Sequence, residues 1–574
     1  MRRQTKLFLD TILLGIIGAL GAQLFGFLLK IFQGFFLNAV AGYGSPGLPN
    51  DGGTLIQTVG SHGLWLIPLV LVAGGIISGA LVYGFAPEAE GHGTDTAVKA
   101  FHKKRGAIRK RVAPVKILAS AITIGSGGAA GREGPTALFS AGFGSIYAEL
   151  THRSDKDRRL LVLIGMGAGL SAIFRSPIGT AIFAVEVLYS DMDFEAEALV
   201  YTMLGSVVAY AINAVFVGWK PLFQIPQSLQ VNEIYSYLFY IILGLASGII
   251  GAVIPTIFYK TRDLFHKISI PRFLKPAIGA LGVGIIALFL PQVLGGGYGW
   301  MQLAINGKLA VSLMAVLLVG KLAAFALTVS SGGSGGVFAP TLFLGVMLGG
   351  LFARFFHQPP AAFAVVGMAA VFGSTARVPL ATLLMVTEMT GGYQLLVPAA
   401  LAVILGFVVQ KAITSSLDLK YISLYEAQMR NRNFSPAHRM QHLKRAVRIL
   451  SDRRSYDPET IGNLDLISLL ESQIPVEIGE DMVLFMINII PGNELVGKDL
   501  KNAAICPANK ECEIVAVFRD EEMFRFDPNI VILPEDQILL LTDKSVSEAV
   551  KKKFLSRKKR RINMKEKFKQ VRKD

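Results

Sequence analysis

Charged residues and cysteines are scarce in this chain. Only 17% of its 574 residues are Asp, Glu, Lys or Arg, whereas a soluble domain usually contains about 25%. The two cysteines, Cys506 and Cys512, have no cluster of histidines near them in the sequence. Because a structural zinc ion takes about four thiol or imidazole ligands, we predict no metal site. The polar C-terminal part also lacks a GxGxxG motif, so nothing indicates a resident cofactor.

Apolar residues, by contrast, fill the first three quarters of the chain. They make up 52% of all residues and crowd positions 7–415. About 20 apolar residues span a bilayer as a helix, and long apolar stretches lie at 7–37, 64–83, 235–257, 276–294 and 311–327. The first is too long for a signal peptide and lacks a small-residue cleavage site, so we interpret it as a retained span. The sequence predicts an all-α polytopic membrane protein.

Two glycine-rich passages interrupt the apolar sequence 205 residues apart. Residues 126–136 read SGGAAGREGPT and residues 331–341 read SGGSGGVFAPT, so that Ser, Gly, Pro and Thr recur without a gap. Exposed backbone at bilayer depth is tolerated only where it lines a site or is buried in protein. Paired broken helices in two halves of a chain point to a transport site at the repeat interface.

The internal repeat extends beyond the glycine passages. Arg175 and Glu186 recur as Arg377 and Glu388, both at an offset of 202 residues. Charged residues are rare in membrane spans, so these matches are hard to attribute to chance. With an odd number of spans in each half the two structural repeats would be inverted, and with an even number they would be parallel.

Arg132 and Glu133 place two charges in the first glycine passage. Charges at membrane depth cost a few kcal/mol each, which makes them candidates for function. The alternative is an internal salt bridge that only holds the fold, although adjacent residues on a helix do not face each other well. An ionised Glu133 would compete with an anion, and a protonated or displaced Glu133 would make room for one. We predict that Glu133 is a gate.

Other candidate anion ligands lie at helix starts and turns. Val337 and Phe338 begin a helix whose N–H groups can bind an anion, unless the preceding glycines serve only close packing. His92 lies in a third glycine turn, with Thr94 as candidate N-cap. Its ring can bind an anion, although a lone histidine is more often structural. Tyr425 ends the last apolar segment and either donates to an anion or belongs to an interfacial belt.

Basic residues predict the orientation in the membrane. They cluster near the N-terminus, at 99–116 and at 153–159, and the positive-inside rule places these segments in the cytoplasm. Residues 551–574 contain thirteen Lys or Arg and two acidic residues. Such a tail can bind nucleic acid, but beside a membrane we favour a disordered tail near anionic lipid and no nucleic-acid partner. We predict a multi-pass protein of the inner (plasma) membrane with both termini cytoplasmic.

The division of the chain follows its composition. We predict a transmembrane domain at 1–430, a helical connector at 431–470, a small cytoplasmic α+β regulatory domain at 471–555 and a basic disordered tail at 556–574. Strand-like runs in the small domain lie at 483–489, 513–519 and 537–542, with a turn into a short helix at 497–500. Because the cytoplasm is reducing, we predict no disulfide between the two cysteines of this domain.

Together these residues resemble the CLC family of chloride channels and chloride/proton exchangers over residues 5–430. Residues 131–135 match its GREGP motif and residues 335–340 its GGxFAP motif. The resemblance implies a homodimer in which each subunit has its own chloride pore and two inverted halves. It makes Glu133 the external gating glutamate and Tyr425 the cap of the central anion site. The anion-binding residues that it implies are His92, Gly93, Arg132, Gly134, Val337 and Phe338.

Two departures from the family pattern bear on mechanism. The first anion-binding turn usually reads GSGIP, and here His92 stands where the serine would be, which puts chloride preference in doubt. Exchangers usually have two consecutive glutamates after the residue that matches Pro177. Here the pair is Glu186 and Val187, and Val187 cannot carry a proton. We therefore predict a gated chloride channel, with a chloride/proton antiporter as the alternative.

The small domain resembles the C-terminal (TrkA-C) subdomain of RCK regulators from about residue 474 to 554. That resemblance implies pairing of two copies and a small cytoplasmic ligand, such as cyclic di-AMP or a nucleotide, that biases pore opening. We predict that the protein is not an enzyme. The distant enzymatic alternative is an intramembrane serine protease, since Ser334 lies in a GxSG pattern and His357 is the later histidine near the membrane.

Overall fold

The computed structural model divides the chain into two compact units, Met1–Asn431 and Arg432–Asp574. It describes residues 3–226, 234–432 and 435. In the second unit it also describes 476–478, 482–489, 493, 495–501, 512–519, 522–534 and 536–544. The basic tail at 556–574, and the connector at 431–470 apart from residues 431, 432 and 435, lie outside the described residues.

Long apolar helices dominate the first unit. Within the described residues, eight are long and apolar enough to cross a membrane. The five predicted stretches correspond to α1 (Arg3–Gln33), α2 (Ile67–Phe85), α9 (Ser236–Lys267), α10 (Lys275–Phe289) and α12 (Val311–Ser330). A π-helical segment, Gly34–Val40, continues α1, and it leads to the short strands β1 (Tyr43–Gly44) and β2 (Thr58–Val59). The predicted polytopic helical fold is confirmed.

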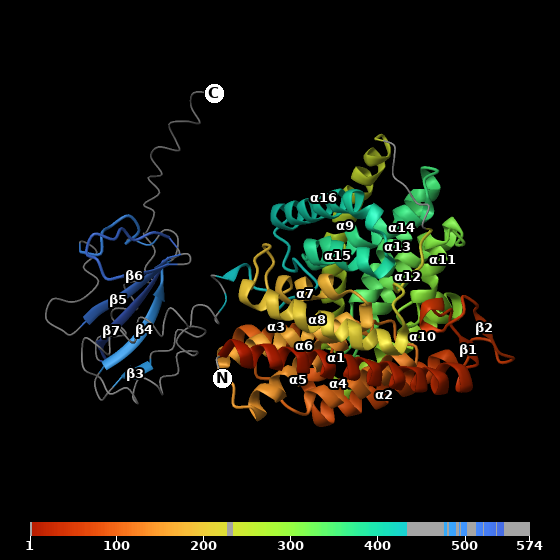
Figure 1. Ribbon diagram of the computed structural model, residues 1–574, viewed down its shortest axis with the longest axis horizontal. Helices are drawn as coiled ribbons and strands as arrows, with labels where there is room; N and C mark the ends of the chain where they lie inside the picture. Colours follow the sequence, from red (N-terminus) through yellow and green to blue (C-terminus); the bar gives the residue numbers. More distant parts are fainter. Residues whose placement is uncertain are drawn as a thin grey trace. The chain divides into compact units, whose positions relative to one another are not determined.

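The remaining helices complete the first unit (Figure 1). They are α3 (Thr94–Lys103), α4 (Val112–Gly125), α5 (Glu133–Leu150), α6 (Asp155–Phe174), α7 (Pro177–Glu186), α8 (Ala196–Val217), α11 (Tyr298–Ile305), α13 (Phe338–Phe355), α14 (Pro360–Ala376), α15 (Pro379–Thr390) and α16 (Leu396–Ser416). Helix α5 packs on α6, and α13 packs on α14. Most residues of α6, α13 and α14 are buried, so these helices form the centre of the unit and hold the starts of α5 and α13 in place.

The internal repeat appears as one contact that is made twice, with the two halves exchanging roles. Glu186 accepts hydrogen bonds from the amides of Leu380 (3.1 Å) and Ala381 (2.7 Å) at the start of α15. Its repeat partner Glu388 accepts them from the amides of Ile178 (3.2 Å) and Gly179 (2.9 Å) at the start of α7. A reciprocal exchange of one contact is what a two-fold axis produces. An internal two-fold axis between the two halves is what the predicted inverted repeats require.

The second unit contains an antiparallel sheet in the order β3-β4-β7-β5-β6. Its strands are β3 (Val476–Ile478), β4 (Met482–Asn488), β5 (Cys512–Arg519), β6 (Glu522–Arg525) and β7 (Gln537–Asp543). The three predicted strands are confirmed as β4, β5 and β7. Their apolar side chains, Phe485 and Leu540 among them, are buried against one another.

Residues 495–501 form the predicted turn, with a β-bridge between Asp499 and Val531, and the residues after it, where the short helix was expected, lie outside the described residues. One expectation for this unit was wrong. Cys512 is disulfide-bonded, and the other cysteine of the chain, Cys506, lies outside the described residues. The expectation of free thiols rested only on the redox state of the compartment.

Candidate anion-binding site

The two glycine passages meet each other in the interior. The amide of Gly131 donates to the carbonyl of Gly336 at 2.7 Å, and Gly336 returns the bond to Gly131 at 2.7 Å. These glycines are equivalent in the repeat, so the two-fold axis passes between them. A Cβ atom on Gly134 would lie 2.1 Å from the carbonyl oxygen of His92. Glycine is therefore required at position 134, where the absence of a side chain lets the turn that contains His92 approach the two helix breaks.

Glu133 begins α5 at this junction. Its side chain is 1% exposed, and neither carboxylate oxygen has a hydrogen-bond partner in the described part of the chain. A Cβ atom on Gly131 would lie 2.1 Å from Oε2 of Glu133, so the carboxylate folds back over the helix break. A buried carboxylate is costly unless it is paired or protonated. A change in the charge of Glu133 would therefore change the electrostatic energy of an ion bound beside it.

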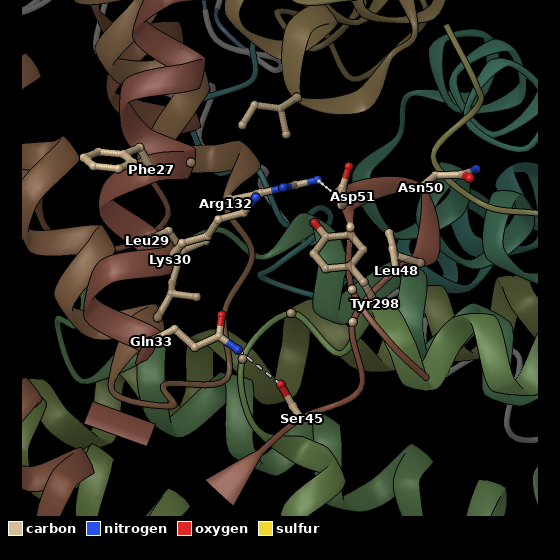
Figure 2. A pocket seen from close by; sticks show the side chains of 18 of the residues that line it. Phe27, Leu29, Lys30, Gln33, Ser45, Leu48, Asn50, Asp51, Arg132 and Tyr298 are labelled. Atoms are coloured by element: carbon tan, nitrogen blue, oxygen red, sulfur yellow. Dashed lines mark hydrogen bonds and ion pairs between the residues drawn. The ribbon is translucent and has the colours of Figure 1, made fainter. Parts of the chain in front are cut away.

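Arg132 does not pair with its neighbour Glu133. Its guanidinium points away from the junction, 3.4 Å from the carboxylate of Asp51 and over the ring of Tyr298, 5.1 Å from the ring centroid (Figure 2). The alternative of an internal ion pair between Arg132 and Glu133 therefore has no support in the geometry. Of the predicted anion ligands, Arg132 is the one that the structure directs elsewhere.

His92 and Tyr425 face each other beside the junction, with ring centroids 5.6 Å apart. Nε2 of His92 lies 3.2 Å from Oδ2 of Asp95, and Nδ1 is buried without a hydrogen-bond partner in the described residues. Tyr425 is 2% exposed, which does not fit an interfacial belt. The N-cap of α3 is Gly93, with φ 88°, and Thr94 is the first helical residue. The prediction of Thr94 as N-cap was wrong because this tight turn needs a positive φ, which glycine adopts readily.

Aromatic rings connect these segments. The ring of Phe338, the first residue of α13, lies 4.1 Å from Phe372 and 4.4 Å from Phe174, measured between centroids. Phe183 lies 6.2 Å from Phe338 and 6.1 Å from Tyr425. The first amides of a helix have no intrahelical partner. The start of α13, with Val337 directly before it, therefore lies in the same buried neighbourhood as His92, Gly134 and Tyr425.

Val187 provides no ionisable group at the position where a second glutamate is usual. It is fully buried at the end of α7. The preceding Glu186 uses both of its carboxylate oxygens to hold the start of α15. The carboxylate of Glu186 therefore has a structural role at the start of α15.

Two buried lysines, which the sequence analysis missed, support the turns. Nζ of Lys116 donates to the carbonyls of Ala89 (2.9 Å) and Gly91 (2.6 Å), just before His92. Nζ of Lys321 donates in the same way to Val293 (2.7 Å) and Gly295 (2.6 Å). Both lysines are 0% exposed. Their spacing of 205 residues equals that of the glycine passages, and this was the signal that would have identified them.

Ser334 has hydrogen-bond partners that do not suit a nucleophile. Its hydroxyl donates to the carbonyl of Ala89 at 2.9 Å and shares a bond of 2.8 Å with the hydroxyl of Ser120. A serine nucleophile needs a general base within hydrogen-bond reach. Among the described contacts of Ser334 no histidine takes that place, so the geometry gives no support to the protease alternative.

Family models and curated relatives both match this chain. The family model described as voltage gated chloride channel matches residues 74–411, and that of the TrkA-C domain matches residues 484–555. The H(+)/Cl(-) exchange transporters ClcA of Salmonella arizonae and Salmonella agona are each 31% identical to this chain over 363 residues. The alignment covers 60% of this chain and 76% of each relative.

Solved structures share the fold at lower identity. A slow cyanobacterial Cl−/H+ antiporter superimposes with a TM-score of 0.63 at 24% identity, covering 72% of this chain and 96% of that one. A CLC-type fluoride/proton antiporter gives 0.62 at 22% identity, covering 75% and 99%. The family model matches more than half of the chain. The chain therefore belongs to the voltage-gated chloride channel (CLC) family of anion-transport proteins, with a TrkA-C domain appended.

Proposed function

We propose that this protein exchanges chloride for protons across a cell membrane, with Glu133 as the group that carries the proton. The observation that carries the proposal is the buried carboxylate of Glu133, which has no hydrogen-bond partner among the described residues, at the meeting point of the two broken helices. Ionised, it occupies space that suits an anion. Protonated, it loses its charge and can move aside, so that proton binding and anion binding exclude each other.

The relatives favour exchange over the gated channel that Val187 suggested. Those in the comparisons are named as H(+)/Cl(-) exchange transporters, and the similar solved structures as antiporters. Val187 still favours the channel as a second candidate, because a hydrocarbon side chain cannot pass on a proton. If the protein exchanges, protons reach Glu133 by a route that does not use residue 187.

Proton movement against its gradient separates the two candidates. Purified protein in liposomes with an outward chloride gradient should drive protons inward, and Glu133→Gln should abolish proton movement while chloride still flows. Glu149→Gln is the matched control, because Glu149 lies on the same helix in an exposed ion pair with Lys110 (2.9 Å). Passive chloride flow without proton uptake in the unmodified protein would decide for the channel.

The ion pairs support the predicted orientation. Arg3 at the start of α1 pairs with Asp157 at 2.6 Å, and Arg153 pairs with Asp10 at 2.6 Å. Arg105 of the segment 99–116 pairs with Asp155 at 3.6 Å, so the basic segments at 99–116 and 153–159 gather at one end of the unit with the start of α1. The positive-inside rule favours a cytoplasmic location for that end. A cysteine introduced at residue 4 that reacts with an impermeant reagent in intact cells would contradict it.

We further propose that the C-terminal unit senses a small cytoplasmic ligand. The match of residues 484–555 to the TrkA-C domain supports this. Titration calorimetry of the full chain with cyclic di-AMP and common nucleotides should detect binding to one of them and a change in chloride flux at the same concentration. Absence of heat and of any change in flux with all of them would contradict the proposal.

A further inference from the structure

Three buried ionisable side chains, which we call the Tyr189 cluster, lie beside the end of α7. The hydroxyl of Tyr189 donates to Oε1 of Glu195, and its ring lies 5.4 Å from that of His102, measured between centroids. Nε2 of His102 lies 3.1 Å from the carbonyl oxygen of Leu188. His102, Tyr189 and Glu195 are 3%, 0% and 9% exposed. The cluster therefore lies directly after Val187, the position at which a proton-carrying glutamate is missing.

The side chains of the Tyr189 cluster are suited to proton transfer. A carbonyl only accepts hydrogen bonds, so Nε2 of His102 carries the proton of the neutral ring and Nδ1 can take up a second one. The hydroxyl of Tyr189 both donates and accepts, and Glu195 can be ionised or protonated. Arg159 of α6 lies close enough to interact electrostatically with Glu195 and Tyr189. Its positive charge favours the ionised carboxylate, which is the form that accepts a proton.

Glu195 lies at the end of the unit that the basic residues mark. Glu197, two residues further along the chain, is exposed and pairs with Arg3 at 3.1 Å and with Lys156 at 2.7 Å. The start of α1 and the segment 153–159 form the end that the positive-inside rule places in the cytoplasm. Because Glu195 is also the most exposed member of the Tyr189 cluster, protons from that side meet it first.

A second pair of ionisable groups, which we call the Asp95 pair, lies on the same helix as His102. Asp95 stands seven residues before His102 in α3, so both lie on one face of the helix, about 10 Å apart. Oδ2 of Asp95 lies 3.2 Å from Nε2 of His92, the other member of the pair. That carboxylate favours a proton on Nε2, so the buried Nδ1 of His92 presents a lone pair. The Asp95 pair borders the junction at which Glu133 begins α5.

One short segment of chain contacts both groups. The amide of Ala427 donates to Oδ1 of Asp95 at 3.1 Å. The amide of Met429 donates to the carbonyl of Leu188 at 3.0 Å, and His102 approaches the same carbonyl. Two residues of chain span at most about 7 Å. Two or three water molecules can bridge such a separation, since hydrogen-bonded oxygens lie about 2.8 Å apart.

We propose that protons travel along α3 from the Tyr189 cluster through the Asp95 pair to Glu133, on a route that replaces the glutamate missing at residue 187. The proposal rests on the proposed function, because an exchanger needs protons to reach Glu133 from the cytoplasm. The carboxyl group of Glu195 gives its proton to the oxygen of Tyr189 while the hydroxyl proton of Tyr189 leaves toward His102. Each group releases one proton for each that it receives, so it returns to its starting charge.

Fluxes of both ions test the route. In liposomes that contain the purified protein, Glu195→Gln should lower chloride-driven proton uptake at least about tenfold while chloride flux stays within about twofold, because a positioned proton-transfer group contributes about 10²–10⁴-fold. Glutamine keeps an oxygen for the hydroxyl of Tyr189, so the variant should fold. Glu195→Asp keeps a carboxylate and should restore part of the proton uptake. Glu197→Gln, at the exposed site two residues away, is the matched control and should leave both fluxes unchanged.

A variant at the other end of the route gives an independent test. Asp95→Asn keeps an oxygen for the amide of Ala427 and should cause the same selective loss of proton uptake. Two groups that act in series on one route are not independent. The double variant Glu195→Gln with Asp95→Asn should therefore lose no more proton uptake than the more affected single variant.

The possible outcomes separate this proposal from the proposed function. Unchanged proton uptake in Glu195→Gln would mean that protons use another route, and equal loss of both fluxes would mean that Glu195 only holds the fold. Either result would overturn the route and leave proton exchange standing. Absence of proton uptake in the unmodified protein would contradict the proposed function, and the route with it.

Discussion

At the scale of the residue, one buried ammonium group holds the turn that carries His92. Lys116→Met removes both charge-assisted hydrogen bonds to Ala89 and Gly91. Each carbonyl is left with one neutral donor, the hydroxyl of Ser334 (2.9 Å) for Ala89 and the amide of Gly335 (3.2 Å) for Gly91. We expect a loss of about 3 kcal/mol in the free energy of unfolding and weaker chloride binding, measured by thermal denaturation and by titration calorimetry. Lys110→Met, at an exposed site, is the control, and equal behaviour of the two variants would contradict this role.

His92 has a ring nitrogen free for a further partner. Replacement of His92 by serine removes that ring nitrogen and also the partner of Asp95 at 3.2 Å, and it introduces a hydroxyl donor. Since one hydrogen bond is worth about 1 kcal/mol, we expect the ratio of chloride to nitrate flux to change about fivefold, in favour of chloride. Ion-replacement measurements on reconstituted protein give this ratio directly. A ratio within experimental error of the unmodified protein would mean that His92 does not contact the anion.

At the scale of the element, the helix breaks depend on the absence of side chains. In Gly134→Ala the new methyl group would lie 2.1 Å from the carbonyl oxygen of His92 and 2.9 Å from Cα of Gly336. Backbone would have to move, at a cost of about 1–3 kcal/mol, and both neighbouring breaks would be displaced. We expect lower thermal stability and loss of most chloride flux.

The matched control is Gly84→Ala in α2. Nothing lies within 4 Å of the position of its Cβ atom, and alanine is the better helix former by about 1 kcal/mol. We expect unchanged or slightly higher stability and full flux. If Gly134→Ala behaved like this control, close backbone approach at the junction would not be needed for transport.

At the scale of the whole molecule, we predict that the face formed by α7 and α15 is the contact surface for a second copy of the chain. These helices have 10 and 12 residues, too few to span a bilayer of about 30 Å. Ile178 and Leu380, equivalent in the repeat, are 42% and 39% exposed on them. A face built from short helices matches lipid poorly, and a second protomer would cover it. This argument supports the homodimer that the resemblance implied.

Stepwise photobleaching of singly labelled protein should therefore give two steps. Ile178→Trp combined with Leu380→Trp should shift the distribution toward one step, because the added bulk would obstruct close packing. Val319→Trp, 72% exposed on α12, should leave two steps. A single step in the unmodified protein would refute the dimer.

Much of this arrangement could be predicted from sequence. The glycine passages identified both helix breaks, and the offset of 202 residues identified Glu186 and Glu388. Each of these carboxylates accepts a hydrogen bond from an amide at the start of a helix in the other half of the repeat. The pairing of Arg132 with Asp51 could not be predicted, because 81 residues separate them and no periodic pattern connects a loop to a helix start. The separation of Arg132 from Glu133 was equally hidden, since adjacent letters do not reveal which way side chains turn.

By itself, the sequence determined where the helices run and break and that the chain repeats, because apolar length, glycine and proline act on the backbone locally. The tertiary structure alone decided which distant groups meet. It joined Gly131 to Gly336, turned Arg132 toward Asp51 and left Glu133 buried without a hydrogen-bond partner in the part of the chain that the structure describes. These pairings arise from packing the two halves about one axis, and the energy of a buried charge depends on what that packing brings within a few ångströms.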